Sequence, residues 1–289
     1  MAGGAIVFLA LFDVGYQVIS GASLAFSTYH LGFLGRRNWI PSAGDFGALP
    51  FIFGTLASSI FSVILSTALG VAIGLFLSLM APRRVAAIVG PLVEMLAAIP
   101  SVVLGLIGIY LIAPFVAQNV EPTLHSVLGF LPIFGDPQPV GNSLFTASLV
   151  LTIMVVPIIA ALTRDLFLTV PQELRDGAEA LGATRWEMIR GVVLPTTQPG
   201  IVAACVLGFG RAIGEAIAVA QIVGGVTVIS ANLFRPADTA AAVIANQFLS
   251  PVSALHTSSM FYLAAILLVM GLGVNLTAHT IASRFAAHR

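Results

Sequence analysis

The sequence predicts an all-α, polytopic membrane protein with six transmembrane helices. Of its 289 residues, 58% are hydrophobic and only 8% are charged, and the mean hydropathy is +1.04. A water-soluble domain needs far more polar surface than this composition provides. Several apolar runs also exceed the roughly 20 residues that a helix needs to cross a bilayer. The composition therefore excludes a soluble globular protein.

The candidate spans are separated by turns or polar segments. They cover about residues 3–26, 51–80, 88–117, 143–162, 200–224 and 257–282. Gly70 and Gly74 form a G-x-x-x-G pattern in the second span, which favours close helix packing. Pro91 and Pro100 are expected to bend the third span. The loop 118–142 contains an apolar run that is too short to cross the membrane.

The distribution of arginine predicts the orientation of the chain. An even number of spans places both termini on one side, and most arginines then lie on that side: Arg83, Arg84, Arg164, Arg175, Arg185, Arg190, Arg284 and Arg289. Arg36, Arg37 and Arg235 lie on the opposite side. The positive-inside rule therefore places both termini in the cytoplasm of a multi-pass protein of the cell membrane.

A polar segment, Pro171–Pro195, interrupts the apolar sequence and carries signals for two short helices. Thr169 and Gln172 have the spacing of a capping box, with Pro171 in the first turn. Gly182 is predicted to end the first helix with a positive φ. Thr184 and Glu187 have the same box spacing, and the second helix is expected to stop before Pro195. Two apolar stripes indicate a surface that binds another protein.

Three of the ionisable residues within the predicted spans are candidates for a functional site. Arg211 and Glu215 are four residues apart, which puts them on one face of a helix. Charges at membrane depth are costly and usually functional, so this pair is a candidate for a substrate pathway. A simple salt bridge is the alternative for the pair. Glu94 is a third candidate, and its carboxylate is expected to pair with an arginine or a backbone donor.

The sequence carries no pattern for catalysis, metal binding or a cofactor. It contains no lysine, so it lacks the phosphate-binding loop of an ATPase. Cys205 is the single cysteine, and the histidines have no metal-ligand spacing. No nucleophile arrangement is visible, so an enzyme is not predicted. If ATP drives this protein, separate subunits must bind the ATP and Mg²⁺.

The polar segment resembles the EAA loop of ATP-binding-cassette (ABC) importer permeases. The matching positions are Asp176, Gly177, Ala178, Gly182, Leu194 and Pro195. Asp176 replaces the Glu of the motif, and Gly177 replaces its first Ala. The resemblance implies the type I, MetI-like permease fold. It also implies that this loop seats on an ATPase subunit and carries its movement to the membrane helices.

Three further stretches are similar to phosphate-specific permeases of the PstC type. They are FGALPFIFGT (46–55), EMLAAIPSVVLGL (94–106) and GRAIGEAIAV (210–219). This resemblance implies import of inorganic phosphate, and it implies that Arg211 and Glu215 matter for transport. The implied partners are a PstA-like second permease, two PstB-like ATPase subunits and an external PstS-like phosphate-binding protein. No nucleic acid is implied.

The domain organisation follows from these resemblances. Residues 1–50 are expected to form a first transmembrane helix and an external segment, and residues 51–284 the permease core with its loop at 171–195. Two other functions stay open. One is a permease for molybdate or sulfate. The other is an ATP-independent secondary transporter, which would leave the polar segment unexplained and for which no inverted repeat is visible.

Overall fold

The structure is a computed structural model that describes residues 2–286, with the side chains of residues 7–277 and 280. Arg284 and Arg289, which the sequence places on the cytoplasmic side, therefore lie outside the described side chains. The chain divides into two compact units. The first unit comprises residues 1–58, 101–150 and 213–271, and the second comprises 59–100, 151–212 and 272–289.

The first unit combines helices and loops with a short antiparallel ribbon, in which Trp39 pairs with Phe46. Its elements begin with α1 (Ala2–Gly21), α2 (Ser23–Tyr29), η1 (His30–Leu34), β1 (Trp39–Ile40), η2 (Pro41–Ala43), β2 (Asp45–Phe46) and the start of α3 (Leu49–Leu75). They continue with α5 (Ser101–Ile107), η4 (Gly108–Ile112), α6 (Ala113–Phe115), η5 (Val116–Val120), α7 (Glu121–Leu128), η6 (Pro132–Phe134) and the start of α8 (Leu144–Leu168). The last are α12 (Ile217–Ile222), α13 (Ala240–Gln247) and most of α14 (Ala254–Ala286).

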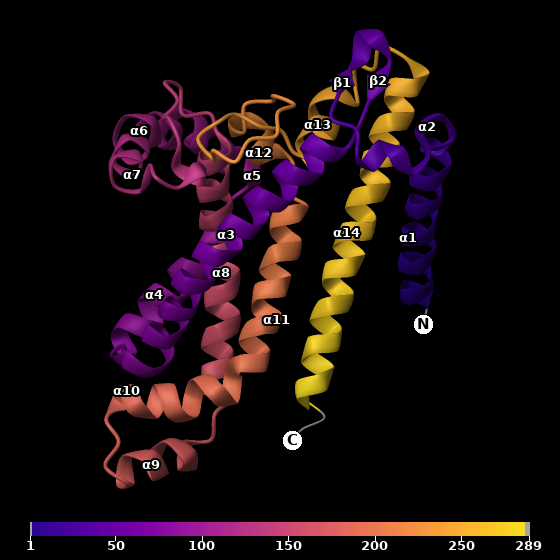
Figure 1. The fold of residues 1–289 in the computed structure, drawn as a ribbon. Coiled ribbons are helices and arrows are strands. Elements are labelled where there is room, and N and C mark those ends of the chain that lie inside the picture. The colour runs from indigo at the N-terminus through magenta and orange to yellow at the C-terminus, as the bar shows by residue number, and fades with distance from the viewer. Residues whose placement is uncertain (1, 287–289) are drawn as a thin grey trace. The chain divides into compact units, whose positions relative to one another are not determined.

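The regular elements of the second unit are all helices in its described residues. It holds the rest of α3 and α8, η3 (Phe76–Met80), α4 (Arg83–Leu96), α9 (Gln172–Ala180), α10 (Arg185–Met188), η7 (Ile189–Val193), α11 (Leu194–Ile213) and the end of α14. Figure 1 shows α9 and α10 together, beyond the ends of α8 and α11. The polar segment therefore projects from one end of this unit.

Among the residues that the structure describes, five helices are long and apolar enough to cross a membrane, or six when the bent pair of helices at residues 7–34 is one span. The second and fourth spans agree closely with the predicted ranges. The third prediction, residues 88–117, is wrong. The chain breaks at Ala97–Pro100, so α4 is a separate helix and the span is Ser101–Leu128. Pro100 lacks an N–H and disfavours helix at Ile99, which explains the break.

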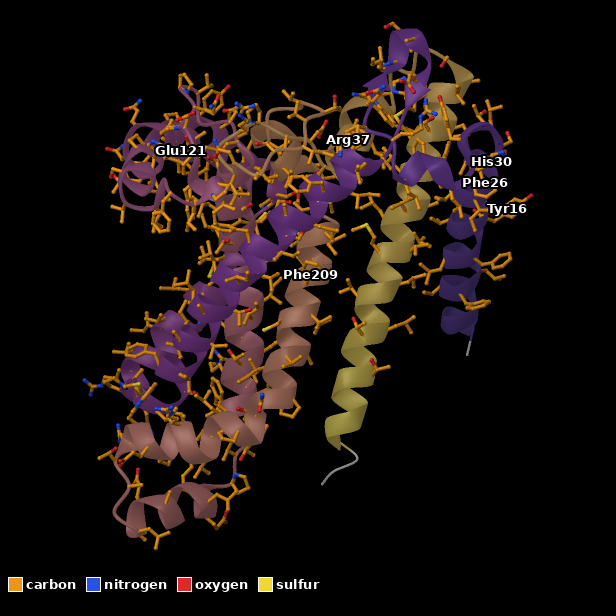
Figure 2. All side chains as sticks on the ribbon, viewed as in Figure 1. Tyr16, Phe26, His30, Arg37, Glu121 and Phe209 are labelled. Atoms are coloured by element: carbon orange, nitrogen blue, oxygen red, sulfur yellow. The ribbon has the colours of Figure 1, made fainter. Side chains whose placement is uncertain are left out.

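The core of the first unit is aromatic. Trp39, Phe46 and Phe51 are buried around His256, whose ring stacks on Phe46 with centroids 5.2 Å apart. Gln247 Oε1 accepts hydrogen bonds from Trp39 Nε1 and lies 2.9 Å from His256 Nε2. These contacts fix the ribbon to α13 and to the start of α14. Phe26 and His30 lie side by side at the end of α2, with centroids 6.2 Å apart (Figure 2).

Glycines let the helices of the second unit pack closely. A Cβ at Gly70 of α3 would lie 2.8 Å from Ile159 Cβ of α8, and one at Gly74 would lie 3.0 Å from the backbone N of Arg164. The G-x-x-x-G pattern is therefore confirmed as a close-packing face. A Cβ at Gly208 of α11 would lie 2.8 Å from Val155 Cγ1 of α8. Both neighbours thus approach α8 closely because they present glycine.

Asp238 is a buried carboxylate just before α13 in the first unit. Its residue is 4% exposed, and its Oδ1 accepts the backbone N–H of Thr239 at 2.8 Å. Its backbone carbonyl lies directly against Gly54 of α3. Burial raises the pKa of Asp238 to about 6, and the hydrogen bond from Thr239 opposes part of this rise.

This raised pKa makes the stability of the fold depend on pH. Folded Asp238 binds its proton more tightly than the unfolded chain does, so stability falls as pH rises from 3.8 through about 6. Above that window, the charged carboxylate costs on the order of 3 kcal/mol. Asp238→Asn removes the charge and keeps an acceptor for Thr239. We expect its thermal midpoint in detergent to exceed that of the wild type at about pH 7.5 and to match it near pH 4.

The control for this experiment is Asp136→Asn, which changes an exposed carboxylate of the same unit. Its midpoint should stay close to that of the wild type at both pH values, since an exposed carboxylate loses little hydration on folding. A midpoint for Asp238→Asn that lies below the wild type at both pH values would contradict the prediction.

Candidate functional site

The first helix of the polar segment begins without the predicted capping box. Pro171 is the N-cap of α9, and no side chain caps this end. The Thr169 hydroxyl instead donates to the carbonyl of Leu166 at 2.7 Å. The capping box at Thr169 and Gln172 is therefore wrong, because the threonine bonds back to the helix that precedes it. Pro171 itself suits this position, since it has no N–H that needs a partner.

The turn after α9 agrees with the prediction for Gly182. Its φ is +89°, a conformation that glycine adopts without steric cost. Gly182 N donates to the carbonyl of Glu179 at 2.9 Å, and Ala183 N donates to that of Ala178 at 3.1 Å. These two bonds form a Schellman motif, which satisfies the last carbonyls of the helix. The turn is thus an ordered reversal between α9 and α10.

The second capping box is confirmed. Thr184 Oγ1 accepts the backbone N–H of Glu187 at 3.3 Å, and Glu187 Oε2 accepts that of Thr184 at 2.8 Å. Both bonds satisfy helix donors that have no partner within the helix. Together with the Schellman motif, this box orders both ends of the turn at Gly182.

The expected stop before Pro195 is wrong. The helix runs from Arg185 to Ile213, because the π-helical turn η7 leads directly into α11. A π turn shifts the hydrogen-bond pattern by one residue, which lets the chain accommodate a proline that would clash in a regular α-helix. Figure 1 shows α10 and α11 running in different directions. The predicted fifth span, residues 200–224, therefore begins and ends too late, since the observed helix is Arg185–Ile213.

The two apolar stripes of the polar segment have different environments. From the second, Ile189 and Val193 are buried in a cluster with Phe167 and Val170 of the α8 end. The remaining large apolar side chains stay exposed: Leu174 by 51%, Leu181 by 91% and Trp186 by 60%. One side of the segment thus packs on its own unit, and the other presents apolar surface.

The residues of the EAA-like pattern lie on two sides of this segment. Asp176 and Gly177 are exposed and Ala178 is half-buried. Asp176 lines a polar cavity of about 230 Å³ whose other charged residues are Arg175, Glu179 and Arg185. Arg175 Nε is buried there without a hydrogen-bond partner among the described residues. This face of α9 therefore carries both acidic and basic side chains.

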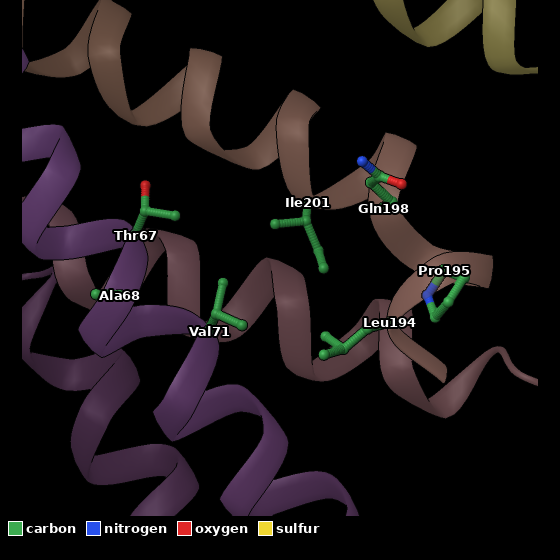
Figure 3. A pocket seen from close by; sticks show the side chains of 7 residues that line it. All are labelled: Thr67, Ala68, Val71, Leu194, Pro195, Gln198 and Ile201. Atoms are coloured by element: carbon green, nitrogen blue, oxygen red, sulfur yellow. The ribbon is translucent and has the colours of Figure 1, made fainter. Parts of the chain in front are cut away.

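Leu194 and Pro195 line a separate, apolar cavity of about 480 Å³ (Figure 3). Thr67, Ala68 and Val71 of α3 form one wall, and Gln198 and Ile201 of α11 continue the other. The structure does not bring Leu194 and Pro195 into the polar cavity that Asp176 lines. They instead mark the place where the polar segment joins the membrane helix.

Arg211 and Glu215 do not lie on one continuous helix, so that part of the prediction is wrong. Helix α11 ends at Ile213, Gly214 follows, and α12 begins at Ile217. Arg211 is exposed on the second unit, whereas Glu215 belongs to the first unit and is 5% exposed. Glu215 Oε1 accepts the backbone N–H of Ala218 at 3.3 Å, so this carboxylate satisfies a donor at the start of α12.

The small residues before Arg211 pack against the same chain. Ala204 is buried, and Gly208 lies against Val155 and Ile159 of α8. This face of α11 is therefore closely packed against α8.

Glu94 has the arginine partner that charge considerations predict. Its Oε1 lies 2.8 Å from Arg164 Nη1, within the second unit. Sequence reasoning missed Arg164, because nothing local in the sequence relates α4 to the end of α8. It also missed Gly90, where a Cβ would lie 2.9 Å from Arg164 Nη1. The sequence did offer one signal for Arg164, namely that it is an arginine near the end of an apolar helix.

Comparison with known proteins places this geometry in a family. Residues 70–286 match the model of the binding-protein-dependent transport system inner membrane component. The chain is 38% identical over 273 residues to the phosphate transport system permease protein PstC of Mesorhizobium japonicum, covering 93% of this chain and 83% of that protein. It is 39% identical over 267 residues to PstC of Pasteurella multocida, covering 91% and 83%.

Solved structures show the same fold at low identity. A chain of the MetNI methionine ABC transporter in an inward-facing conformation has a TM-score of 0.59 and 20% identity, covering 81% of this chain and 93% of its own. A chain of the bacterial alginate ABC transporter in complex with its periplasmic protein has a TM-score of 0.63 and 18% identity, covering 98% and 93%. The fold is therefore MetI-like. The chain belongs to the family of binding-protein-dependent transport system inner membrane components, in the group of PstC-type permeases.

Proposed function

We propose that this chain is the membrane-spanning permease subunit of an ATP-driven importer of inorganic phosphate. The observation that carries the proposal is the 38% identity to a PstC protein over 93% of the chain. The spans and the MetI-like fold support a transport subunit rather than an enzyme. Residues 51–284 would form its permease core, preceded by a first helix and an external segment in residues 1–50.

The partners follow from the chemistry that this chain lacks. It has no lysine for a phosphate-binding loop, so separate PstB-like ATPase subunits would bind ATP and Mg²⁺. A PstA-like permease would complete the path, and a PstS-like external protein would deliver phosphate. Both termini would lie in the cytoplasm with the polar segment, as the arginine distribution indicates.

The polar segment would be the element that couples ATP hydrolysis to transport. Leu174, Leu181 and Trp186 are exposed outside any apolar core, which suits contact with another protein. Asp176 and Gly177 lie on the same helix, α9. The cluster beneath the segment, which includes Ile189 and Phe167, would pass its movement to α8 and α11.

Arg211 would provide the positive charge of the phosphate path. Its planar guanidinium stays charged and can bind two phosphate oxygens at once. It is exposed on its unit, as a residue that meets a passing anion must be. Glu215 would adjust this charge between passages, although its contact with Ala218 also gives it a structural part. Glu94 would act on the pathway only through Arg164.

The orientation can be tested with single cysteines in a Cys205→Ser background. Val140→Cys and Trp186→Cys replace exposed residues in the two segments that should lie on opposite sides. We expect a membrane-impermeant maleimide to label Val140→Cys from outside the cell and Trp186→Cys only after lysis. Labelling of both positions from the same side would contradict the proposed topology.

Gly182→Val tests the turn of the polar segment. Valine is strained at a φ of +89°, so the reversal between α9 and α10 should be lost while the membrane core still folds. We expect phosphate uptake to fall about tenfold or more, as the cost of positive φ in a β-branched residue is large. Gly191→Val is the control, since a Cβ at Gly191 meets nothing within 4 Å. Normal uptake and ATPase association in Gly182→Val would contradict the coupling role.

Substitutions at Arg211 test the phosphate path. Arg211→Gln should abolish uptake, because an anion in an apolar environment then has no compensating charge. Arg211→Lys keeps the charge but loses the fork, so an intermediate rate of uptake is expected. Arg37→Gln removes an exposed arginine elsewhere and should leave uptake unchanged (Figure 2). Uptake restored by exchanging the charges, with Arg211→Glu and Glu215→Arg together, would leave only a salt-bridge role for the pair.

A further inference from the structure

Helix α4 is packed lightly on its own unit. Gly90 is the only buried residue of α4, and Ile88, Leu92 and Met95 are 64%, 56% and 67% exposed. The chain breaks directly after it, at Ala97–Pro100. A short helix with so little surface buried against its own unit is held in position by a few specific contacts.

The specific contact is an ion pair with α8. Glu94 Oε1 lies 2.8 Å from Arg164 Nη1, with side chains 47% and 26% exposed. Gly90, one turn before Glu94, faces the same guanidinium, since a Cβ there would lie 2.9 Å from Nη1. Arg164 Nη2 also contacts its neighbour Asp165 at 3.2 Å. The ion pair therefore lies in a space that Gly90 leaves open. It is more than a chance contact of two flexible side chains.

Arg164 is also joined to the polar segment through a rigid connection. It lies in the last turns of α8, which ends at Leu168, and α9 begins at Gln172. Phe167 and Val170, on either side of this end, are buried with Met188 of α10. A displacement of the polar segment therefore has to move the end of α8, and Arg164 with it.

We propose that Glu94 and Arg164 are positioning residues that make α4 follow the movement of the polar segment during transport, with Gly90 as the cradle of the pair. This inference rests on the proposed coupling function of that segment. Because an exposed ion pair is weak, it can break and form again within a cycle. Without it, α4 keeps its helix but no longer follows α8, and ATP is hydrolysed without a matching passage of phosphate.

The decisive readout is the amount of ATP hydrolysed per phosphate transported, measured on the assembled importer in vesicles with its binding protein. Glu94→Gln, Arg164→Gln and Gly90→Val each disturb the pair in a different way. We expect each variant to raise this ratio about threefold or more, because the coupling energy of an exposed ion pair corresponds to a fold-change of that order. The exchange of charges, Glu94→Arg with Arg164→Glu, should bring the ratio back toward that of the wild type.

Asp165→Asn is the matched control, because it removes the other carboxylate beside Arg164 and leaves Glu94 in place. Its ratio should stay that of the wild type. A purely structural pair would lower transport and ATP hydrolysis together, in proportion to the complex recovered. That outcome, or an unchanged ratio in all three variants, would overturn the proposal.

A second measurement does not depend on the substrate. Spin labels at Leu92→Cys on α4 and Leu168→Cys on α8, in a Cys205→Ser background, replace exposed residues. Pulsed resonance should give a narrow distance distribution that Glu94→Gln broadens and Asp165→Asn does not. An equally narrow distribution in Glu94→Gln would overturn the proposal. If the wild-type importer showed no phosphate uptake but Glu94→Gln still broadened the distance distribution, the proposed function would be rejected. The positioning role of the pair would be retained.

Discussion

The second unit depends on the close approach of three helices around Ile159 of α8. Gly70 of α3 brings its backbone against Ile159 Cβ, and Gly208 of α11 lies against the same side chain. Without side chains at these two positions, dispersion contacts between the helices replace contacts with lipid, which offers no hydrophobic driving force of its own. Helix α8 carries Arg164 of the Glu94–Arg164 ion pair, α8 and α11 hold the two ends of the polar segment, and α3 and α11 line the apolar cavity. The geometry of all three features therefore depends on this helix packing.

Prediction from the sequence succeeded where one residue type has one physical role. The positive φ of Gly182, the capping box of Thr184 and the packing of Gly70 each follow from local chemistry and are confirmed. Hydropathy predicted six spans, which the described residues contain if the bent pair at residues 7–34 is one span. It misplaced the third span, because Pro100 separates two helices that the prediction joined. The chemistry of Glu94 predicted an arginine partner, yet only the tertiary structure identifies it as Arg164.

Pro195 shows why helix boundaries were the hardest part. In water, a proline ends a helix because the freed carbonyls can bind solvent. Inside a bilayer those groups need protein partners, so continuing the helix through a π turn is the better solution. Two further π turns, Gly108–Ile112 and Val116–Val120, flank Pro114 in the same way, whereas the π turn Phe76–Met80 lies at the end of a helix that stops before Pro82. Proline therefore has no single effect in this chain, since Pro91, Pro157 and Pro199 lie inside α-helices and Pro82 and Pro100 lie at breaks.

Four charged residues of the apolar sequence lie beside helix ends or breaks, unlike Asp13, which lies in the middle of α1. Glu94 lies just before the break at Ala97–Pro100, Glu215 lies between α11 and α12, and Arg164 and Arg211 lie in the last turns of their helices. A break leaves backbone N–H groups without partners, and a nearby carboxylate can accept from them, as Glu215 does from Ala218. A cation is stabilised at a helix C-terminus by the helix dipole. Exchanging Arg211 and Glu215 would therefore reverse both local effects, so loss of function in that exchange needs a folding measurement beside it.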